Sequence, residues 1–367
     1  MTGKRSTISD VALHAGVSKA TVSAVLNETG SVKDATRDRV LAAIERLNYR
    51  PTQATGRGAA ARKGKCIALV IKEHDNPYYA QVIDGVRAAT DAAGYTLLVI
   101  SSEGKYEIER RAVELVRDKD VDGLIVTPVV DEHADLSHFF ELKRRNCPFV
   151  LLEEIRGVPA SLVDLDNVEA SRTAVEYLIG LGHTRVVHFA GPAYSTHSQE
   201  RVDGVRLAFS RSHLAVRDDG IVPAGAHLAD GYRAGLAYFG ERLGAADRPT
   251  AVTCYNDLVA VGLCRALADL GLRVPEDVSV VGYDDVPLCE YLAAPLTTVR
   301  VPKVEMGETA ARMLLRHIES KQAIPLQKVY LDGALVVRRT TSAPGQPAQD
   351  PPPALSPHET HLATSGA

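Results

Sequence analysis

The spacing of apolar side chains changes character near residue 65. Before that point they recur every three to four positions, which is the period of a helix with one buried face. Ile8, Val11 and Ala12 share the first such face. A second helix is predicted at Lys19–Leu26 and a third from about Lys33 to Leu47. The first 50 residues are therefore expected to form a small all-α domain.

Beyond residue 65, short apolar runs rich in β-branched residues alternate with helix-length segments, a pattern typical of βαβ units around a parallel sheet. The first series of expected strands is Cys66–Ile71, Thr96–Ile100, Gly123–Val126 and Phe149–Leu152. The second is Val186–Ala190, Gly220–Val222, Ala251–Cys254 and Ser279–Val281. Two series predict the α/β fold class, with two similar subdomains and a ligand cleft between them.

The first two helices have the pattern of a helix-turn-helix. A short turn containing Gly16 separates them, and Ser18 is placed to cap the second. Residues 1–64 hold 11 Lys and Arg against 5 Asp and Glu, whereas the rest of the chain holds 31 against 41. The overall charge of −4 thus hides a basic head on an acidic body. A generic helical bundle is the alternative, but the turn, the cap and the charge favour DNA binding.

Composition changes at both ends of the body. Residues 51–64 are basic and rich in Gly and Ala, as in a hinge or linker, and residues 343–367 form a Pro-rich polar tail expected to be disordered. The longest apolar runs are far shorter than the roughly 20 residues of a membrane helix. The amino terminus lacks the apolar segment of a secretory signal, and the five cysteines are widely spaced, so a cytoplasmic protein without metal or cofactor is expected.

Several motifs resemble the LacI/GalR family of repressors. They are TISDVA at 7–12, AGVS at 15–18, ATVS at 20–23, NPYY at 76–79, VDG at 121–123, LGH at 181–183, VPEDVSVVGYDD at 274–285 and PLTTV at 295–299. The resemblance spans residues 7–341 in family order. It implies a helix-turn-helix domain at 1–50 and a core at 65–342 like a type I periplasmic binding protein, with two Rossmann-like subdomains. These are expected at 65–162 with 297–325, and at 163–296 with 326–342.

The resemblance also implies partners: a pseudo-palindromic operator bound by a homodimer or tetramer, and a small effector, expected to be a sugar. The implied DNA contacts are Thr7, Ser18, Lys19, Ala20, Thr21, Ser23, Asn27, Tyr49 and Arg57. Of these, Lys19 and Ala20 would face base edges. The residues that would help to hold the DNA backbone are Thr7, Thr21, Ser23, Asn27 and Tyr49. Val11, Val22, Val25 and Leu26 are expected in the core of the head instead.

Two positions depart from the family pattern in the head. Ala24 stands where many relatives carry an Arg that reads a guanine, a contact that contributes roughly 1–3 kcal/mol of discrimination. The segment 54–59 lacks the Leu that relatives wedge into the minor groove. We therefore expect this hinge to kink its operator less than relatives do, or to fold only marginally on DNA.

The implied effector contacts come from both subdomains. They are Tyr78, Tyr79, Asp166, His197, Arg201, Asn256 and Asp284, with Ser195 as a further candidate. Aromatic faces suit a sugar ring, while carboxylates, amides and a guanidinium suit its hydroxyl groups. Ala226 matches a position where some relatives have a stacking aromatic, which makes a sugar a better effector than a purine.

Other interpretations stay open for single residues and for the chain. Asp284 and Asp285 could be a solvated loop pair, and Asn256 could cap the following helix. No P-loop, G-x-S-x-G, H-E-x-x-H or strand-linked G-x-G-x-x-G occurs, so an enzyme is not expected. The basic head argues against a transport binding protein. The remaining alternative is a regulator whose cleft is vestigial and whose effector is a protein.

Overall fold

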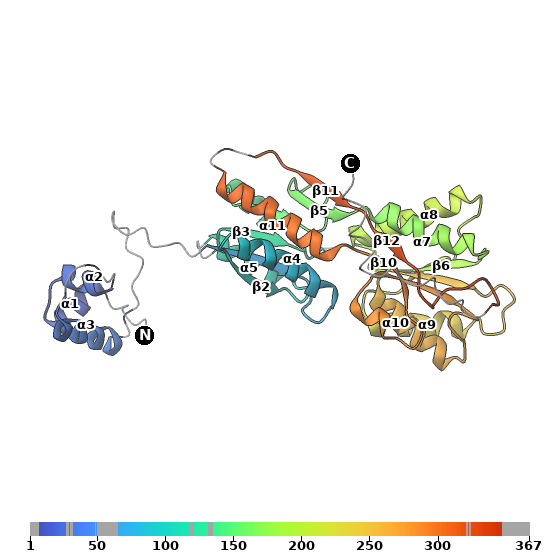
Figure 1. Cartoon of the computed structure of the whole chain (residues 1–367), viewed down its shortest axis with the longest axis horizontal. Helices are drawn as coiled ribbons and strands as arrows, with labels where there is room; N and C mark the ends of the chain where they lie inside the picture. Colours follow the sequence, from blue (N-terminus) through green and yellow to red (C-terminus); the bar gives the residue numbers. More distant parts are fainter. Residues whose placement is uncertain are drawn as a thin grey trace, which may run out of the picture. The chain divides into compact units, whose positions relative to one another are not determined.

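The computed structural model divides the chain into two compact units, residues 1–63 and 64–367 (Figure 1). It describes residues 7–26, 29, 32–47, 49, 65–117, 121–130, 135–320, 322 and 324–346. The predicted hinge at 51–64 and residues 347–367 of the predicted tail lie outside these ranges. The two units are called the head and the body below.

The head contains the three predicted helices. These are α1 (Ile8–Ala15), α2 (Lys19–Leu26) and α3 (Asp34–Arg46). Gly16 ends α1 in the left-handed conformation at φ 64°, which a residue without a Cβ adopts at no steric cost. Val11, Val22 and Val40 are fully buried between the helices, and Leu26 packs against them. The predicted core role of the valines on α1 and α2 is therefore confirmed.

The described part of the body forms two six-stranded sheets. The first has the order β11-β5-β4-β3-β1-β2 and is entirely parallel; the second has the order β12-β10-β9-β8-β6-β7, with β12 antiparallel. The first sheet comprises β1 (Cys66–Ile71), β2 (Thr96–Ser101), β3 (Gly123–Val126), β4 (Phe149–Leu151), β5 (Ser161–Leu165) and β11 (Lys328–Leu331). The second comprises β6 (Val186–Ala190), β7 (Ile221–Pro223), β8 (Ala251–Cys254), β9 (Ser279–Asp284), β10 (Thr297–Arg300) and β12 (Ala334–Val336).

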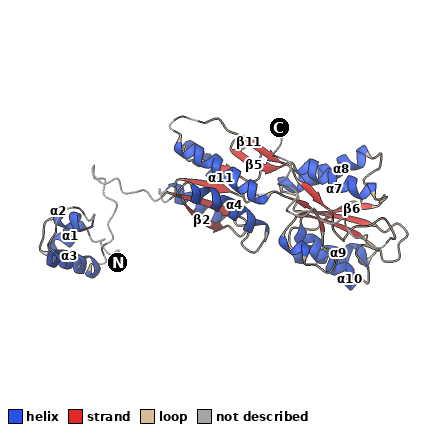
Figure 2. Ribbon diagram, in the orientation of Figure 1, coloured by secondary structure: helices blue, strands red, loops and turns tan. Residues whose placement is uncertain are grey.

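Helices cover both faces of each sheet (Figure 2). The first subdomain, built on the β1 sheet, carries α4 (Tyr78–Ala92), α5 (Tyr106–Arg117), α6 (Ser137–Arg144) and α11 (Lys303–Glu319). The second subdomain, built on the β6 sheet, carries α7 (Asn167–Gly180), α8 (Thr196–Arg211), α9 (Leu228–Gly240), α10 (Asp257–Asp269) and the 3₁₀ turn η1 (Pro287–Glu290). The predicted α/β class with two Rossmann-like subdomains is confirmed.

Side-chain alternation explains this double covering. Ile67 and Leu69 of β1 pack with α4 and α11, whereas Ala68 and Val70 pack with α5 and α6. Successive residues of a strand point to opposite faces, so a strand that is apolar throughout requires helices on both sides. The uninterrupted apolar runs of the sequence are thus explained by burial on two faces.

The sheets divide the chain differently from the expected subdomain ranges. Residues 297–300 were expected in the first subdomain, but β10 pairs with β9 in the second. Residues 326–342 were expected in the second, but β11 pairs with β5 in the first. The described chain passes between the subdomains three times: after β5, after β10 and after β11. Short strands carry no signal for the sheet that they join, which explains the difference.

Candidate DNA-reading head and effector cleft

Polar caps fix the ends of the two helices that form the helix-turn-helix. Thr7 and Asp10 bond reciprocally in a capping box at the start of α1, with 2.7 Å from Thr7 N to the Asp10 carboxylate. Ser18 Oγ accepts a hydrogen bond of 3.1 Å from the backbone N–H of Thr21 at the start of α2. Lys19 and Ala20 are exposed in the first turn of α2. The first turn of α2 therefore presents an exposed cation and a small side chain.

The other predicted DNA contacts are less uniform. Thr7 is exposed, while Thr21 and Ser23 are half-buried on α2. Tyr49 is only 8% exposed and belongs to the core of the head, so most of its ring supports the fold. Asn27 and Arg57 lie outside the described residues. Their predicted roles, like those of the other contacts, stay predictions.

The cleft of the body lies where strands of both sheets end. Lys72 and Glu73 follow β1, Thr127 follows β3 and Glu153 follows shortly after β4, while Tyr255 follows β8. β1 and β3 flank the point where the strand order of the first sheet reverses, and β8 flanks the corresponding point of the second. Open α/β sheets place ligands at such points. A cavity of about 100 Å³ is lined here by Lys72, Glu73, Asn76, Tyr78, Tyr79, Thr127, Leu152, Glu153, His197, Arg201, Ala226, Tyr255, Asn256 and Asp284.

Six of the seven predicted effector residues line this cavity, and Asp166 does not. Asp166 is exposed and caps α7, accepting a 2.9 Å hydrogen bond from the backbone N–H of Glu169. The buried carboxylate nearby belongs to Asp164, whose Oδ1 lies 2.8 Å from Nε2 of His197. The sequence motif thus drew attention to a helix cap rather than to the acid on the strand.

Arg201 is held in one orientation by its neighbours. Its guanidinium donates to Asn167 Oδ1 over 3.1 Å and to the carbonyl oxygen of Tyr255, and it lies 3.6 Å from the ring centre of Tyr283. The residue is 6% exposed. A planar cation fixed in this way offers its remaining N–H groups to a ligand with little loss of side-chain entropy.

Lys72 and Glu153 form an ion pair in the cavity wall. Burial opposes ionisation of Glu153, but Lys72 and His197 outweigh it, so the pKa of Glu153 is lowered to about 2. Ser195, which lies at the start of α8 in the second subdomain, donates to Glu153 over 3.3 Å. The pair is therefore charged at neutral pH and also connects the two walls of the cleft.

Two histidines of the second subdomain bond to acids of the first. His197 pairs with Asp164, and Nε2 of His227 lies 2.9 Å from the Glu73 carboxylate. Burial opposes protonation of both rings, but the facing carboxylates outweigh it, so the pKa of each histidine is raised. These two pairs and the Ser195 bond cross the cleft and favour its closed arrangement.

Asp284 occupies a constrained position at the end of β9. Its backbone has φ 115° and that of Asp285 has φ 56°. Both values lie in a region that residues other than glycine rarely adopt. Burial raises the pKa of Asp284 to about 7, with Asp257 adding to the effect and Arg201 opposing it. Backbone strain and a perturbed pKa at a cavity wall are common at binding sites.

Asn256 has both predicted roles available to it. Its Oδ1 accepts from the Val259 N–H over 2.8 Å and so caps α10, and its amide donates to the carbonyl oxygen of Ala226 over 2.8 Å. Asp257, by contrast, is fully buried and bonds to Val286 N–H over 2.9 Å and to Thr298. Asn256 therefore faces the cavity from a fixed position, and Asp257 supports the Asp284 loop from behind.

Sequence reasoning missed several residues of the cavity wall. The most informative is Thr127, which is 6% exposed and whose Oγ1 is among the buried polar atoms without a hydrogen-bond partner. Such an atom is costly in a closed interior and is explained when a ligand hydroxyl meets it. Lys72, Glu153 and Tyr255 were missed as well. Each of them lies at or shortly after the carboxyl end of a strand, and this position was the available signal in the sequence.

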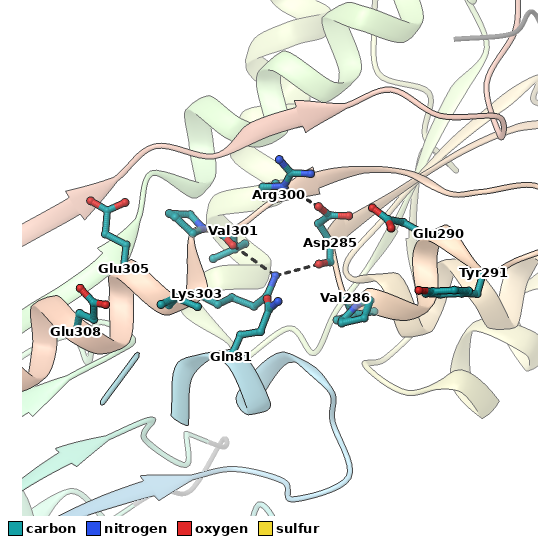
Figure 3. A pocket seen from close by; sticks show the side chains of 13 residues that line it. Gln81, Asp285, Val286, Glu290, Tyr291, Arg300, Val301, Lys303, Glu305 and Glu308 are labelled. Carbon is teal, nitrogen blue, oxygen red and sulfur yellow. Dashed lines mark hydrogen bonds and ion pairs between the residues drawn. The ribbon is translucent and has the colours of Figure 1, made fainter. Parts of the chain in front are cut away.

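A larger hollow of about 620 Å³ lies on the other side of the Asp284 loop (Figure 3). Asp285, Arg300, Lys303, Glu305 and Glu308 contribute to its wall. Asp285 is paired with Arg300 and Arg338, each over 2.7 Å. The Lys303 ammonium in this wall is bonded to backbone carbonyl oxygens.

Within the described ranges, no group of three or more His, Cys, Asp or Glu side chains is arranged to hold a metal ion. None of the helices described is long and apolar enough to cross a membrane.

Comparison with known proteins identifies the class of both units. Residues 7–52 match the family described as bacterial regulatory proteins, lacI family, and residues 175–341 match the periplasmic binding protein-like domain. The Lac repressor dimer bound to operator and the anti-inducer ONPF aligns with a TM-score of 0.67 and 28% identity over 93% of this chain and all of that one. The CelR–cellobiose complex aligns with a TM-score of 0.66 and 31% identity over 92% and 100% of the two chains. Fold and sites are those of a DNA-binding regulator with an effector-binding core.

The chain is also 34% identical over 329 residues to the HTH-type transcriptional repressor PurR of Vibrio vulnificus (strain CMCP6), covering 86% of this chain and 93% of that repressor. It belongs to the LacI family of bacterial regulatory proteins. As a member, it is a DNA-binding transcriptional repressor and not an enzyme. The family resemblance seen in the sequence motifs is therefore confirmed.

Proposed function

We propose that this repressor acts in the cytoplasm as a homodimer on a pseudo-palindromic operator, and that a neutral sugar in the cleft controls it. Two heads related by a two-fold axis would read the two halves of such an operator. The Lac repressor was solved as a dimer on its operator, which supports this assembly. In each head, the exposed first turn of α2 with Lys19 and Ala20 would face the base edges.

The balance of charges in the cleft carries the choice of a sugar. Lys72 is paired with Glu153, Asp164 with His197 and Glu73 with His227, while Arg201 faces Asp284. A wall of paired charges offers many hydrogen-bond donors and acceptors but little net charge, which suits vicinal hydroxyl groups. The unpartnered hydroxyl of Thr127 adds one more hydrogen-bonding group to the wall.

The aromatic side chains of the cleft also favour a sugar. Tyr78 and Tyr79 line one side of the cavity, and Ala226 lines another. An alanine supplies no ring face at that position, so it offers a purine base no aromatic partner there. CelR was solved with cellobiose, which shows that a related core accommodates a sugar.

The test is a panel of neutral sugars including cellobiose, together with hypoxanthine, guanine and adenine. Binding is read as a rise in melting temperature and as a changed affinity for an operator selected from random duplex DNA. One or more sugars should produce both effects. A response to a purine base alone would overturn the choice of a sugar.

The Arg201→Ala variant tests the site itself. It should lower sugar affinity at least tenfold and leave operator binding without sugar unchanged. Arg206→Ala is the matched control, because Arg206 lies on the same helix, is exposed and pairs with Asp203 over 3.3 Å. If the regulatory response to sugar survived Arg201→Ala, the assignment of the cleft would be wrong.

A protein effector is the second candidate. The cavity of about 100 Å³ holds only a few water molecules, so a sugar requires the cleft to widen. If calorimetry detects no sugar or base across the panel while operator binding is intact, this vestigial-cleft alternative is favoured.

A further inference from the structure

Lys303 joins the two subdomains at one wall of the cleft. It is the first residue of α11, it is 2% exposed, and its Nζ donates to three backbone carbonyl oxygens, two of which are drawn in Figure 3. These belong to Asp284, to Asp285 over 3.1 Å and to Val301 over 3.4 Å. The three N–H groups of the ammonium thus match three acceptors at the end of β9 and at the crossover after β10.

The loop that Lys303 holds separates the cleft from the outer hollow. Asp284 lines the cleft, whereas Asp285 lines the hollow of Figure 3. Both residues have positive φ, a conformation that persists in non-glycine residues only where surrounding contacts impose it. The ammonium of Lys303 supplies such contacts to both carbonyl groups, and the pairing of Asp285 with Arg300 and Arg338 supplies the rest.

The same turn of α11 also contacts the opposite wall. Met306 Sδ accepts a hydrogen bond of 3.3 Å from the hydroxyl of Tyr78, the first residue of α4 and a residue of the cavity wall. Residues 303–306 therefore touch Asp284 of the second subdomain through Lys303 and Tyr78 of the first through Met306. A change in the separation of the two walls must move this turn or break one of its contacts.

We propose that Lys303 is the positioning residue of the cleft: it fixes the backbone that aims the Asp284 carboxylate and couples that loop to α11 of the first subdomain. This rests on the proposed role of the cleft as the effector site. Lys303 touches no effector itself, because its ammonium is committed to backbone oxygens. Its effect on binding is transmitted through Asp284.

The first test removes the ammonium and needs no effector. In full-length Lys303→Met, hydrogen exchange of backbone amides at 283–286 should be at least tenfold faster than in the unmodified chain. Amides in the first turn of α11 should also exchange faster, while those of the head and of β7 should be unchanged. The matched control is Arg312→Met, on the same helix, 57% exposed and paired with Glu308. Unchanged exchange at 283–286, or a uniform increase over the whole body, would overturn the proposal.

A second measurement separates positioning from packing. The positive charge of Lys303 lowers the pKa of Asp284, so its removal should raise the titration midpoint of that carboxyl group. Carbon-13 NMR of labelled aspartate reads this midpoint, with Asp284→Asn assigning the signal. An upward shift in Lys303→Met but not in Arg312→Met is expected, and equal midpoints in the two variants would contradict the proposal.

A milder variant covers the case in which Lys303→Met does not fold. Lys303→Gln keeps N–H donors but loses the charge, and it should show the same upward shift of the Asp284 midpoint with a smaller change in exchange. Cellobiose binding is then compared in the folded variant and in the unmodified chain. If the unmodified chain binds no sugar, the proposed effector fails, while the exchange and titration results still decide the role of Lys303.

Discussion

Asp284 shows how burial and backbone conformation combine at a single residue. The charge of Arg201, on α8 of the same subdomain, favours the ionised carboxylate, yet burial raises the pKa of Asp284 to about 7. Its positive φ is imposed by Lys303 and by the ion pairs of its neighbour Asp285. The conformation and the protonation state of Asp284 are both unfavourable for an isolated aspartate. A residue held in this way stores free energy that a ligand can release.

Asp284→Asn should therefore stabilise the body while lowering effector affinity. The folded chain keeps a proton on Asp284 that the unfolded chain loses, so the free energy of unfolding falls between about pH 4 and pH 7 because of this group. The asparagine of the variant does not titrate, so its free energy of unfolding does not fall in this way. We expect that free energy to exceed the value of the unmodified chain by about 1–3 kcal/mol at pH 8 and to equal it near pH 4. Urea denaturation at both pH values measures it. A variant that is less stable than the unmodified chain at pH 8 would show that the charge of Asp284 is stabilising.

The difference between Asp166 and Asp164 shows how far single residues could be predicted from the sequence. Both lie on or next to β5, and an Asp before a helix has a strong preference for the capping position. The sequence cannot tell which of two nearby acids has its environment completed by a distant histidine. Tyr78, Arg201 and Asn256 were found because motifs mark them, whereas Thr127 required knowledge of which strands are neighbours.

The elements are held together by close helix crossings as well as by the sheets. α4 and α11 lie side by side in the first subdomain (Figure 1). Glycines stand at the crossing on both helices: a Cβ at Gly85 would overlap the carbonyl oxygen of Val304, and a Cβ at Gly307 would overlap that of Val82. The position of Lys303 at the start of α11 thus depends on direct contact between the backbones of α4 and α11.

Gly85→Ala should therefore destabilise the body, by about 1–3 kcal/mol or more, since the added methyl group forces the helices apart. Gly180→Ala is the control, because Gly180 ends α7 with no atom within 4 Å of an added Cβ. There the change should stabilise by about 0.5–1 kcal/mol through lower backbone entropy of the unfolded chain. Thermal unfolding monitored by circular dichroism compares the two. Equal effects would show that the crossing tolerates a side chain.

Element prediction worked best where a strand is buried on both faces. β1, β3, β6 and β8 were predicted with the bounds that the structure has. β12 lies in the second subdomain, as expected for its range. β10 and β11 were assigned to the wrong subdomain, because strands of four residues have neither a long apolar run nor a clear two-sided pattern. Their assignment depends on the path of the chain between subdomains, which local sequence does not encode.

At the scale of the whole molecule, the chain separates DNA reading from effector binding. The head has its own core around Val11, Val22 and Val40, and it forms a compact unit distinct from the body. Deleting residues 1–63 should abolish operator binding and leave sugar affinity within twofold. Mobility-shift and calorimetric titrations of the body alone measure these. Loss of both functions together would argue against independent units.

The contacts across the cleft predict how pH acts on the body. The raised pKa of His197 means that its bond to Asp164 stabilises fully below about pH 6.5 and that this contribution is lost as pH rises through the raised value. His197→Gln should therefore cost about 1–2 kcal/mol more at pH 6 than at pH 9. Urea denaturation of the body measures the cost. His213→Gln, at an exposed position of the body, controls for loss of an imidazole, and a pH-independent cost would contradict the charged pair.

The three passages of the chain between subdomains have a consequence for synthesis on the ribosome. The first subdomain receives its edge strand β11 and its helix α11 only after every parallel strand of the second has been made. A nascent chain that ends at residue 165 holds five strands of the first sheet but lacks the helix that covers their inner face. The first subdomain therefore cannot complete its core before almost the whole body has emerged. The two subdomains must finish folding together, and truncation anywhere before residue 331 leaves the earlier one incomplete.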